Sequence, residues 1–164
     1  MTEATDERVS LSPHPDDEII GCYSVFKKYK NETINIVYTT NVDNLRREES
    51  LKFKEYFNVR QFFVNNNIPP ILINKNNIFY FPEPYSDFHP DHRKIGLIGE
   101  QMSRDGYNVI FYTIQKNTNY IYELDNEDKK EKEEMINYIY HSQKSLWEYE
   151  KKYIFFEGYM KFLF

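Results

Sequence analysis

VSLSPHPDDEIIGC, residues 9–22, decides the class of fold. Its first four residues, 9–12, alternate apolar and small side chains and predict a short buried strand. Pro13 and Pro15 stiffen the turn that follows, and the apolar residues beyond it predict a helix over 18–29. A strand joined to a helix by a tight turn is the first half of a β-α-β unit. The sequence therefore predicts an α/β protein.

The rest of the chain continues the alternation of strands and helices. Strands are predicted over 33–39, 61–64, 71–73, 78–81 and 107–113, helices over 45–57, 90–103 and about 129–140, and a final strand or packed tail over 153–164. Such alternation implies right-handed crossovers and a Rossmann-like three-layer fold with a mostly parallel sheet. Ligands of such folds lie beyond the carboxyl ends of the strands, where both histidine-bearing turns are predicted.

Composition sets the domain count and excludes one class of partner. The chain has 164 residues, of which 40% are hydrophobic and 29% charged, so we expect one globular domain over 9–164. The polar residues 1–8 have no periodicity and predict a flexible arm. The net charge of -5 argues against binding to duplex nucleic acid, which needs a basic face. Oligomeric state cannot be deduced from the sequence.

The cellular compartment is predicted from what the sequence lacks. One cysteine, Cys22, cannot form an internal disulfide, and no pattern of a secretory signal peptide precedes it. No stretch approaches the roughly 20 apolar residues that a transmembrane helix needs. We therefore expect a cytoplasmic protein without a transmembrane segment.

The first turn concentrates groups that can bind a metal. His14, Asp16, Asp17 and Glu18 bring one imidazole and three carboxylates into five residues at the start of a helix. Like charges this close repel one another unless a positive charge compensates them. A divalent metal ion is the simplest compensation, so the turn predicts a metal site.

A second turn repeats this pattern. His89 and His92 are spaced to share one face of a starting helix, and Asp91 lies between them. Histidine and aspartate ligands with one open position are typical of catalytic zinc, whereas structural zinc is usually enclosed by four ligands rich in cysteine. With Cys22 as the only cysteine, a closed thiolate site is excluded.

These two motifs resemble those of the PIG-L/LmbE-like N-acetylglucosaminyl deacetylases. The resemblance covers residues 14–22 (HPDDEIIGC) and 89–92 (HPDH), with weaker similarity at 40–41, 46–49, 57–59 and 142–143. It implies an LmbE-like version of the α/β fold. It also implies a zinc-dependent hydrolase, with Fe²⁺ as the alternative metal. The reaction it implies removes the acetyl group from an N-acetylated amino sugar conjugate and releases acetate and a free amine.

The resemblance also implies roles for individual residues. His14, Asp17 and His92 would hold the metal, and Asp16 would act as the general base and later pass its proton to the leaving amine. His89 would stabilise the oxyanion, with Asp91 orienting and charging it.

Arg46 matches a position that contacts substrate in the family, since a guanidinium suits a hydroxyl pair or a phosphate. Arg47 is the alternative if the register differs by one, and Arg46 with Glu49 could instead form a surface ion pair. The family usually has two glycines where this chain has Tyr23 and Ser24, and the chain is shorter than typical members. Substrate specificity therefore does not transfer with the mechanism.

Other interpretations remain beside this one. The two clusters could be capped helix starts with surface histidines, and a glutamate such as Glu18 in a first turn is explained by the helix dipole or by hydrogen bonding near a metal. We interpret His141 as a surface residue and Cys22 as a small buried side chain. The same metal site could cleave another amide or an ester, or the protein could be a catalytically silent carbohydrate-binding protein.

Overall fold

The fold is built on one sheet, in which the third and fourth strands of the sequence flank the first two. The structure is a computed structural model that describes residues 6–85, 89–113, 121–143 and 154–162. Within these residues one sheet has seven strands, in the order β3-β2-β1-β4-β5-β7-β6. The strands are β1 (Arg8–Ser12), β2 (Ile34–Tyr38), β3 (Val59–Phe63), β4 (Ile78–Pro82), β5 (Asn108–Thr113), β6 (Ile121–Glu123) and β7 (Phe156–Met160). The first five in this spatial order are parallel, and β7 runs antiparallel to β5 and β6.

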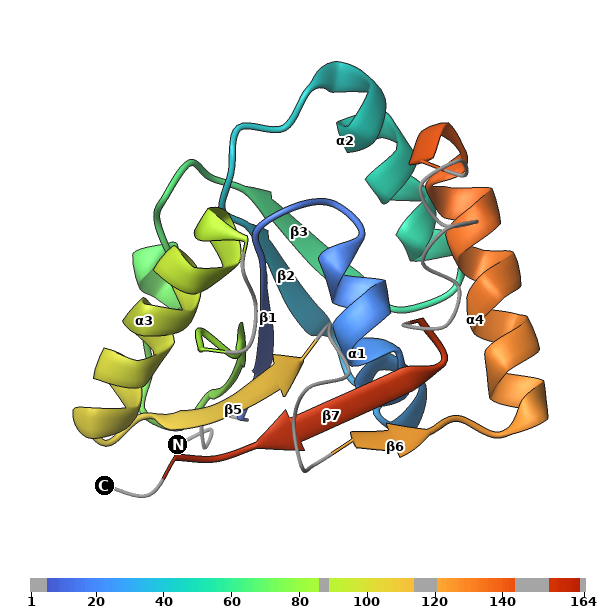
Figure 1. Ribbon diagram of the computed structural model, residues 1–164. Coiled ribbons are helices and arrows are strands. Elements are labelled where there is room, and N and C mark those ends of the chain that lie inside the picture. Colours follow the sequence, from blue (N-terminus) through green and yellow to red (C-terminus); the bar gives the residue numbers. More distant parts are fainter. Residues whose placement is uncertain (1–5, 86–88, 114–120, 144–153, 163–164) are drawn as a thin grey trace.

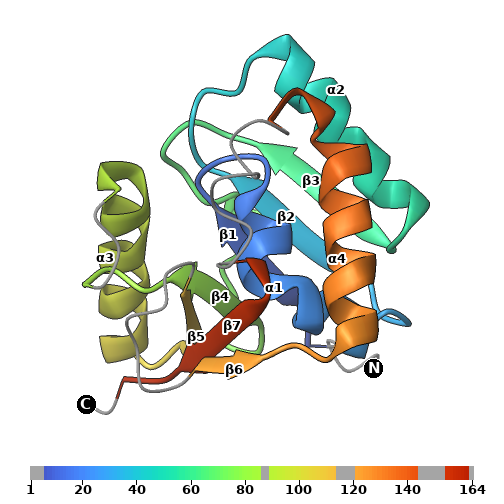
Figure 2. The same cartoon turned by 45° about the vertical axis from the view of Figure 1, so that its right-hand side comes forward.

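Helices cover both faces of the sheet (Figures 1 and 2). They are α1 (Asp17–Lys28), α2 (Asn44–Leu51), α3 (Pro90–Arg104) and α4 (Asn126–Ile139), with short 3₁₀ turns at Lys52–Glu55, Pro70–Leu72 and His141–Gln143. Figure 2 shows α3 on one face and α1, α2 and α4 on the other. Each face has its own apolar core, one built with α1 and α4 and one with Ile95 of α3. The predicted Rossmann-like three-layer fold with a mostly parallel sheet is confirmed.

Three elements differ from the sequence prediction. The strand predicted over 71–73 is wrong, because Pro69 and Pro70 favour a 3₁₀ turn there. The helix predicted over 45–57 ends at Leu51 and continues as a 3₁₀ turn. Strand β6 was not predicted, and the tail forms β7. Residues 1–5 of the predicted flexible arm lie outside the described residues, and Arg8 already belongs to β1.

Two glycines let α3 approach the sheet closely. A Cβ on Gly96 would lie 2.4 Å from the backbone oxygen of Pro82, and one on Gly99 would lie 2.4 Å from Cγ of Phe81. Contacts this short are not compatible with a side chain, so both positions need glycine. The close packing brings the start of α3 to the end of β4, which positions the second histidine motif.

Helix α1 is interrupted at Cys22, and a buried ion pair takes the place of the missing backbone hydrogen bond. Cys22 has non-helical angles (φ -126°, ψ 15°). An unbroken helix would pair the Ser24 N–H with the Ile20 carbonyl. Here the Ser24 N–H donates to Oε1 of Glu157 at 3.0 Å, and the Ile20 carbonyl accepts from Nζ of Lys132 at 2.7 Å.

The two charged side chains also contact each other. Nζ of Lys132 lies 3.3 Å from Oε2 of Glu157, and both side chains are fully buried. Glu157 accepts two further hydrogen bonds, from the hydroxyls of Ser24 and Tyr159. The pair therefore joins α1, α4 and β7 behind the turn that carries the first motif.

We expect Lys132→Met to lower the free energy of unfolding by about 3–5 kcal/mol, because it leaves the Glu157 carboxylate buried without its cation. The double variant Lys132→Met/Glu157→Leu should recover most of this loss, since the Ser24 N–H and the Ile20 carbonyl can then pair with each other. Urea unfolding followed by circular dichroism measures both. Lys27→Met, which removes a surface ion pair with Asp128, is the control and should change stability by less than about 1 kcal/mol. A double variant as unstable as the single one would contradict this account.

Candidate metal centre

The two histidine motifs meet at the carboxyl ends of β1 and β4. His14 lies in the turn from β1 to α1, and His89 and His92 lie at the start of α3, which follows β4. After β1 the chain continues to β2 and β3 on one side and then crosses to β4 on the other. This change of direction is the place where open α/β sheets bind ligands.

The three histidines form a cluster that could hold a metal ion. One ring nitrogen of each lies within 4.8 Å of the other two. The ring centroids of His14 and His89 are 4.7 Å apart, and those of His89 and His92 are 4.8 Å apart. His92 is buried, with 8% of its side chain exposed, whereas 48% of the His89 side chain is exposed.

Asp17 contacts two of these histidines, His14 and His92. Its Oδ2 lies 3.1 Å from Nε2 of His92 and 3.3 Å from Nδ1 of His14, and the two ring nitrogens are 3.3 Å apart. The Asp17 Oδ2 also accepts the backbone N–H of His14 at 2.8 Å, which holds the turn closed. The three side chains therefore present one atom each at the corners of a nearly equilateral triangle.

Charge interactions within this triangle shift the pKa values. Burial alone would raise the pKa of Asp17, but the charges and hydrogen bonds of His92 and His14 outweigh it and lower that pKa. Burial would lower the pKa of His14, but hydrogen bonds to Asp17 and Asp91 and the charge of Asp17 raise it. Asp17 is therefore a carboxylate that attracts positive charge.

Asp91 contacts a different histidine from the one expected. Its Oδ2 lies 2.9 Å from Nε2 of His14 and 3.9 Å from Nδ1 of His89. The His89 Nδ1 instead accepts the backbone N–H of Asp91 at 3.2 Å, so that His89 caps α3. The Asp91 carboxylate is placed to orient His14 through the ring nitrogen that faces away from Asp17.

Asp16 lies beside this cluster in an unusual backbone conformation. Its φ is 139°, one of two positive values at non-glycine residues in the described part of the chain. Burial raises the pKa of Asp16 well above its usual range, the neighbouring Asp17 raises it further, and Arg46 offsets only part of this. A carboxyl with a raised pKa is suited to accepting and returning a proton near neutral pH.

Arg46 contacts Asp16, an interaction that the sequence did not predict. Its Nη2 donates to Oδ2 of Asp16 at 2.7 Å and to the carbonyl of Pro15 at 2.6 Å. Its Nε is buried and has no hydrogen-bond partner among the described residues. Neighbouring Arg47 lies over the ring of Phe63, with its guanidinium carbon 4.3 Å from the ring centroid. Arg46 thus holds the candidate base, and part of its side chain remains exposed.

Sequence reasoning gave Glu18 no place in the site. The structure buries Glu18 completely and surrounds it with hydroxyls of Tyr38 and Tyr140. No sequence signal identifies these partners, because they lie 20 and 122 residues away. Glu49, which the sequence pairs with Arg46, instead accepts the backbone N–H of Ser142 at 2.9 Å.

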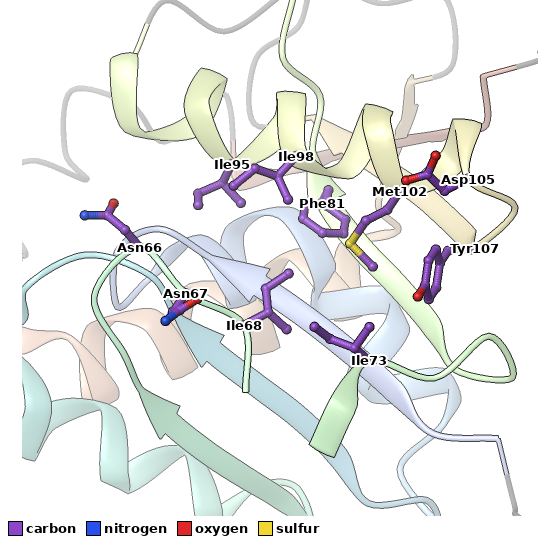
Figure 3. A pocket seen from close by; sticks show the side chains of 10 residues that line it. All are labelled: Asn66, Asn67, Ile68, Ile73, Phe81, Ile95, Ile98, Met102, Asp105 and Tyr107. Carbon is purple, nitrogen blue, oxygen red and sulfur yellow. The ribbon is translucent and has the colours of Figure 1, made fainter. Parts of the chain in front are cut away.

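A separate cavity of about 350 Å³ lies beside α3 (Figure 3). Its lining residues are Asn66, Asn67, Ile68, Ile73, Phe81, Ile95, Ile98, Met102, Asp105 and Tyr107. Figure 3 shows the side chains of α3 facing those of the segment after β3 across this space. None of the lining residues belongs to the histidine cluster, although Ile95 lies one helical turn from His92.

Comparisons with known proteins show the fold. The chain is similar to the conserved protein TT1542 from Thermus thermophilus, with a TM-score of 0.65 and 13% identity, over 97% of this chain and 96% of that one. It is also similar to GalB, the 4-carboxy-2-hydroxymuconate hydratase from Pseudomonas putida, with a TM-score of 0.54 and 10% identity, over 98% of both chains. Structural likeness at these identities shows that the fold is shared. It does not show that the reaction is shared.

The family membership predicted from the sequence is wrong. No family model matches the chain, and no curated protein matches its sequence. The structural likeness instead extends over nearly the whole chain to TT1542 and GalB. The two short motifs describe the chemistry of two turns, and such turns do not by themselves define a family. No helix within the described residues is long and apolar enough to cross a membrane.

Proposed function

We propose that the protein is a metal-dependent hydrolase in which His14, Asp17 and His92 hold Zn²⁺, with Fe²⁺ as the alternative ion. The triangle formed by His14 Nδ1, Asp17 Oδ2 and His92 Nε2 carries this proposal, with sides of 3.1, 3.3 and 3.3 Å. Ligands at the usual zinc distance of about 2.0–2.1 Å in a tetrahedron stand about 3.3 Å apart. The spacing of these three donor atoms therefore supports zinc as the ion they would hold.

The three-histidine cluster offers a different ligand set, with His89 in place of Asp17. Two observations favour Asp17. Its Oδ2 lies 3.1 Å from the His92 nitrogen and 3.3 Å from the His14 nitrogen, whereas the ring nitrogens of the three histidines lie up to 4.8 Å apart. The lowered pKa of Asp17 also keeps it negatively charged. His89 is half exposed, so it can face a substrate arriving from solvent.

The residues around the triangle support hydrolysis of an amide. A divalent ion held there supplies Lewis acidity toward a carbonyl oxygen and lowers the pKa of a water molecule. Asp16, with its raised pKa, takes the proton of the attacking water and later gives it to the leaving amine. Burial, His92 and His14 lower the pKa of His89, so its neutral ring can donate an N–H to the developing oxyanion.

We propose an N-acetylated amino sugar conjugate as the substrate, which would yield acetate and a free amine. The carboxylates of 14–18 and the histidines of 89–92 offer the base and the oxyanion donor that amide hydrolysis needs, and the Arg46 guanidinium, on a side chain that is 21% exposed, can bind a hydroxyl or phosphate oxygen. Another amide, an ester, or binding of a carbohydrate without turnover are the alternatives that product analysis separates.

The purified protein stripped of metal should bind one zinc ion per chain. Asp17→Asn and His92→Ala should abolish stoichiometric binding, because each removes a corner of the triangle, whereas His89→Ala should retain it. Isothermal titration calorimetry measures the affinity, and His141→Ala is the surface control. Loss of zinc in His89→Ala together with retention in Asp17→Asn would instead support the three-histidine site.

Asp91→Ala should weaken zinc binding by about 10–100-fold, because it removes the carboxylate that orients His14. The stoichiometry should remain one ion per chain. Competition with a chromophoric chelator measures this change. An unchanged affinity would show that the contact between Asp91 and His14 does not support the metal ligand.

Zinc-loaded protein should release acetate and free amine from at least one member of a panel of N-acetylglucosamine conjugates. Chelation should stop the reaction, and Asp16→Asn should lower kcat by about 10²–10⁴-fold with zinc still bound, since it removes the general base. Acetate and amine are quantified separately. Bound zinc without acetate release across the panel would contradict the proposed substrate class.

A further inference from the structure

Asp16 is held in a conformation that an aspartate rarely adopts. Its φ of 139° and ψ of -30° lie outside the regions that side chains other than glycine favour. Such a conformation persists only where the surrounding structure enforces it. The neighbours of Asp16 must therefore supply that constraint.

Asp16 also fails to act as a helix cap, although it occupies the cap position of α1. An aspartate there usually accepts an N–H from the first helical turn. The Asp16 side chain makes no such bond and contacts Arg46 instead. The turned backbone thus releases the carboxylate from its usual local role and leaves it against Arg46, next to Asp17 in the chain.

Glu18 supplies a constraint on this backbone. Its Oε2 accepts the backbone N–H of Asp16 at 2.9 Å, so the glutamate reaches back over the start of its own helix. Its Oε1 accepts from the hydroxyls of Tyr140 and Tyr38, the latter at 3.4 Å. All three side chains are fully buried.

The tyrosines place this carboxylate on rigid parts of the fold. Tyr38 ends β2, and its hydroxyl accepts from Nε2 of Gln61 on β3 at 3.2 Å. Tyr140 caps the carboxyl end of α4. A chain of hydrogen bonds therefore runs from the sheet and from α4, through Glu18, to the backbone of Asp16.

We propose that Glu18 is a positioning residue, which together with Tyr140 and Tyr38 keeps the Asp16 backbone turned so that its carboxylate stays against Arg46, beside the proposed metal ligand Asp17. The consequence for catalysis rests on the proposed function of Asp16 as general base. A glutamate whose only role is a favourable interaction with the helix dipole would need neither complete burial nor two tyrosine partners. Glu18 acts through Asp16 and does not itself touch a substrate.

Crystal structures of zinc-loaded Glu18→Ala and Glu18→Gln test the positioning role without any substrate. In Glu18→Ala we expect Asp16 to take a negative φ and to lose its contact with Nη2 of Arg46, while zinc stays bound at one ion per chain. In Glu18→Gln the amide oxygen can still accept the Asp16 N–H, so the turned backbone should be retained. Asp16 unchanged in Glu18→Ala would overturn the proposal.

Kinetics on a substrate that the wild type turns over provide the second readout. Glu18→Ala should lower kcat by about 10²-fold with little change in KM, as expected for a displaced general base. Glu18→Gln should recover most of the rate. Glu49→Gln removes a different buried carboxylate, one bound by Ser142, and should leave kcat unchanged. Equal losses in Glu18→Ala and Glu49→Gln would show a general effect of removing a buried charge and would overturn the proposal.

Tyr140→Phe covers the case in which Glu18→Ala does not fold. It deletes one hydroxyl and keeps the ring, so we expect a smaller loss of kcat and partial displacement of Asp16 in the crystal. A Tyr140→Phe protein with both Asp16 and kcat unchanged would count against the proposal. If the wild type hydrolyses no conjugate, the proposed substrate class fails, and the crystal structures alone decide whether Glu18 positions Asp16.

Discussion

The buried ion pair between Lys132 and Glu157 fixes where the helix of the first motif sits relative to the rest of the fold. It replaces one hydrogen bond of α1 and connects that helix to α4 and β7. The first turn of α1, which carries Asp16 and Asp17, is thereby tied to elements from the opposite end of the chain. A helix held only by apolar packing could slide along its axis, whereas directional hydrogen bonds to charged groups fix its position.

The first turn of α1 and the first turn of α3 then face each other across the carboxyl end of β1. Close packing at Gly96 and Gly99 sets the position of α3, and Asp17 bridges to His92. Negative charge at Asp17 is balanced by imidazoles within the structure, and it is also the charge that a divalent ion would satisfy. The same local arrangement explains why Asp16 and Asp17, adjacent in sequence, have pKa values shifted in opposite directions.

The likeness to TT1542 and GalB extends over nearly the whole chain and concerns the fold. An open α/β sheet with a site at its carboxyl edge supports many reactions, and one of these two similar proteins is named as a hydratase. The fold therefore does not identify a reaction, and the proposed hydrolysis depends on the side chains at the carboxyl edge. A triangle of donor atoms, a carboxyl with a raised pKa and a half-exposed histidine are the observations that support the proposed hydrolysis.

The sequence by itself determined the layered α/β fold, most of its elements and the two turns that carry the histidines. Periodicity and charge density are local properties, so strand 9–12, the helix from Pro90 and the crowding of carboxylates at 16–18 can all be recognised without a structure. Only the tertiary structure decided that Asp91 contacts His14, that Arg46 holds Asp16 and that Tyr140 binds Glu18. These pairs lie 77, 30 and 122 residues apart, and no local pattern encodes which distant side chains meet.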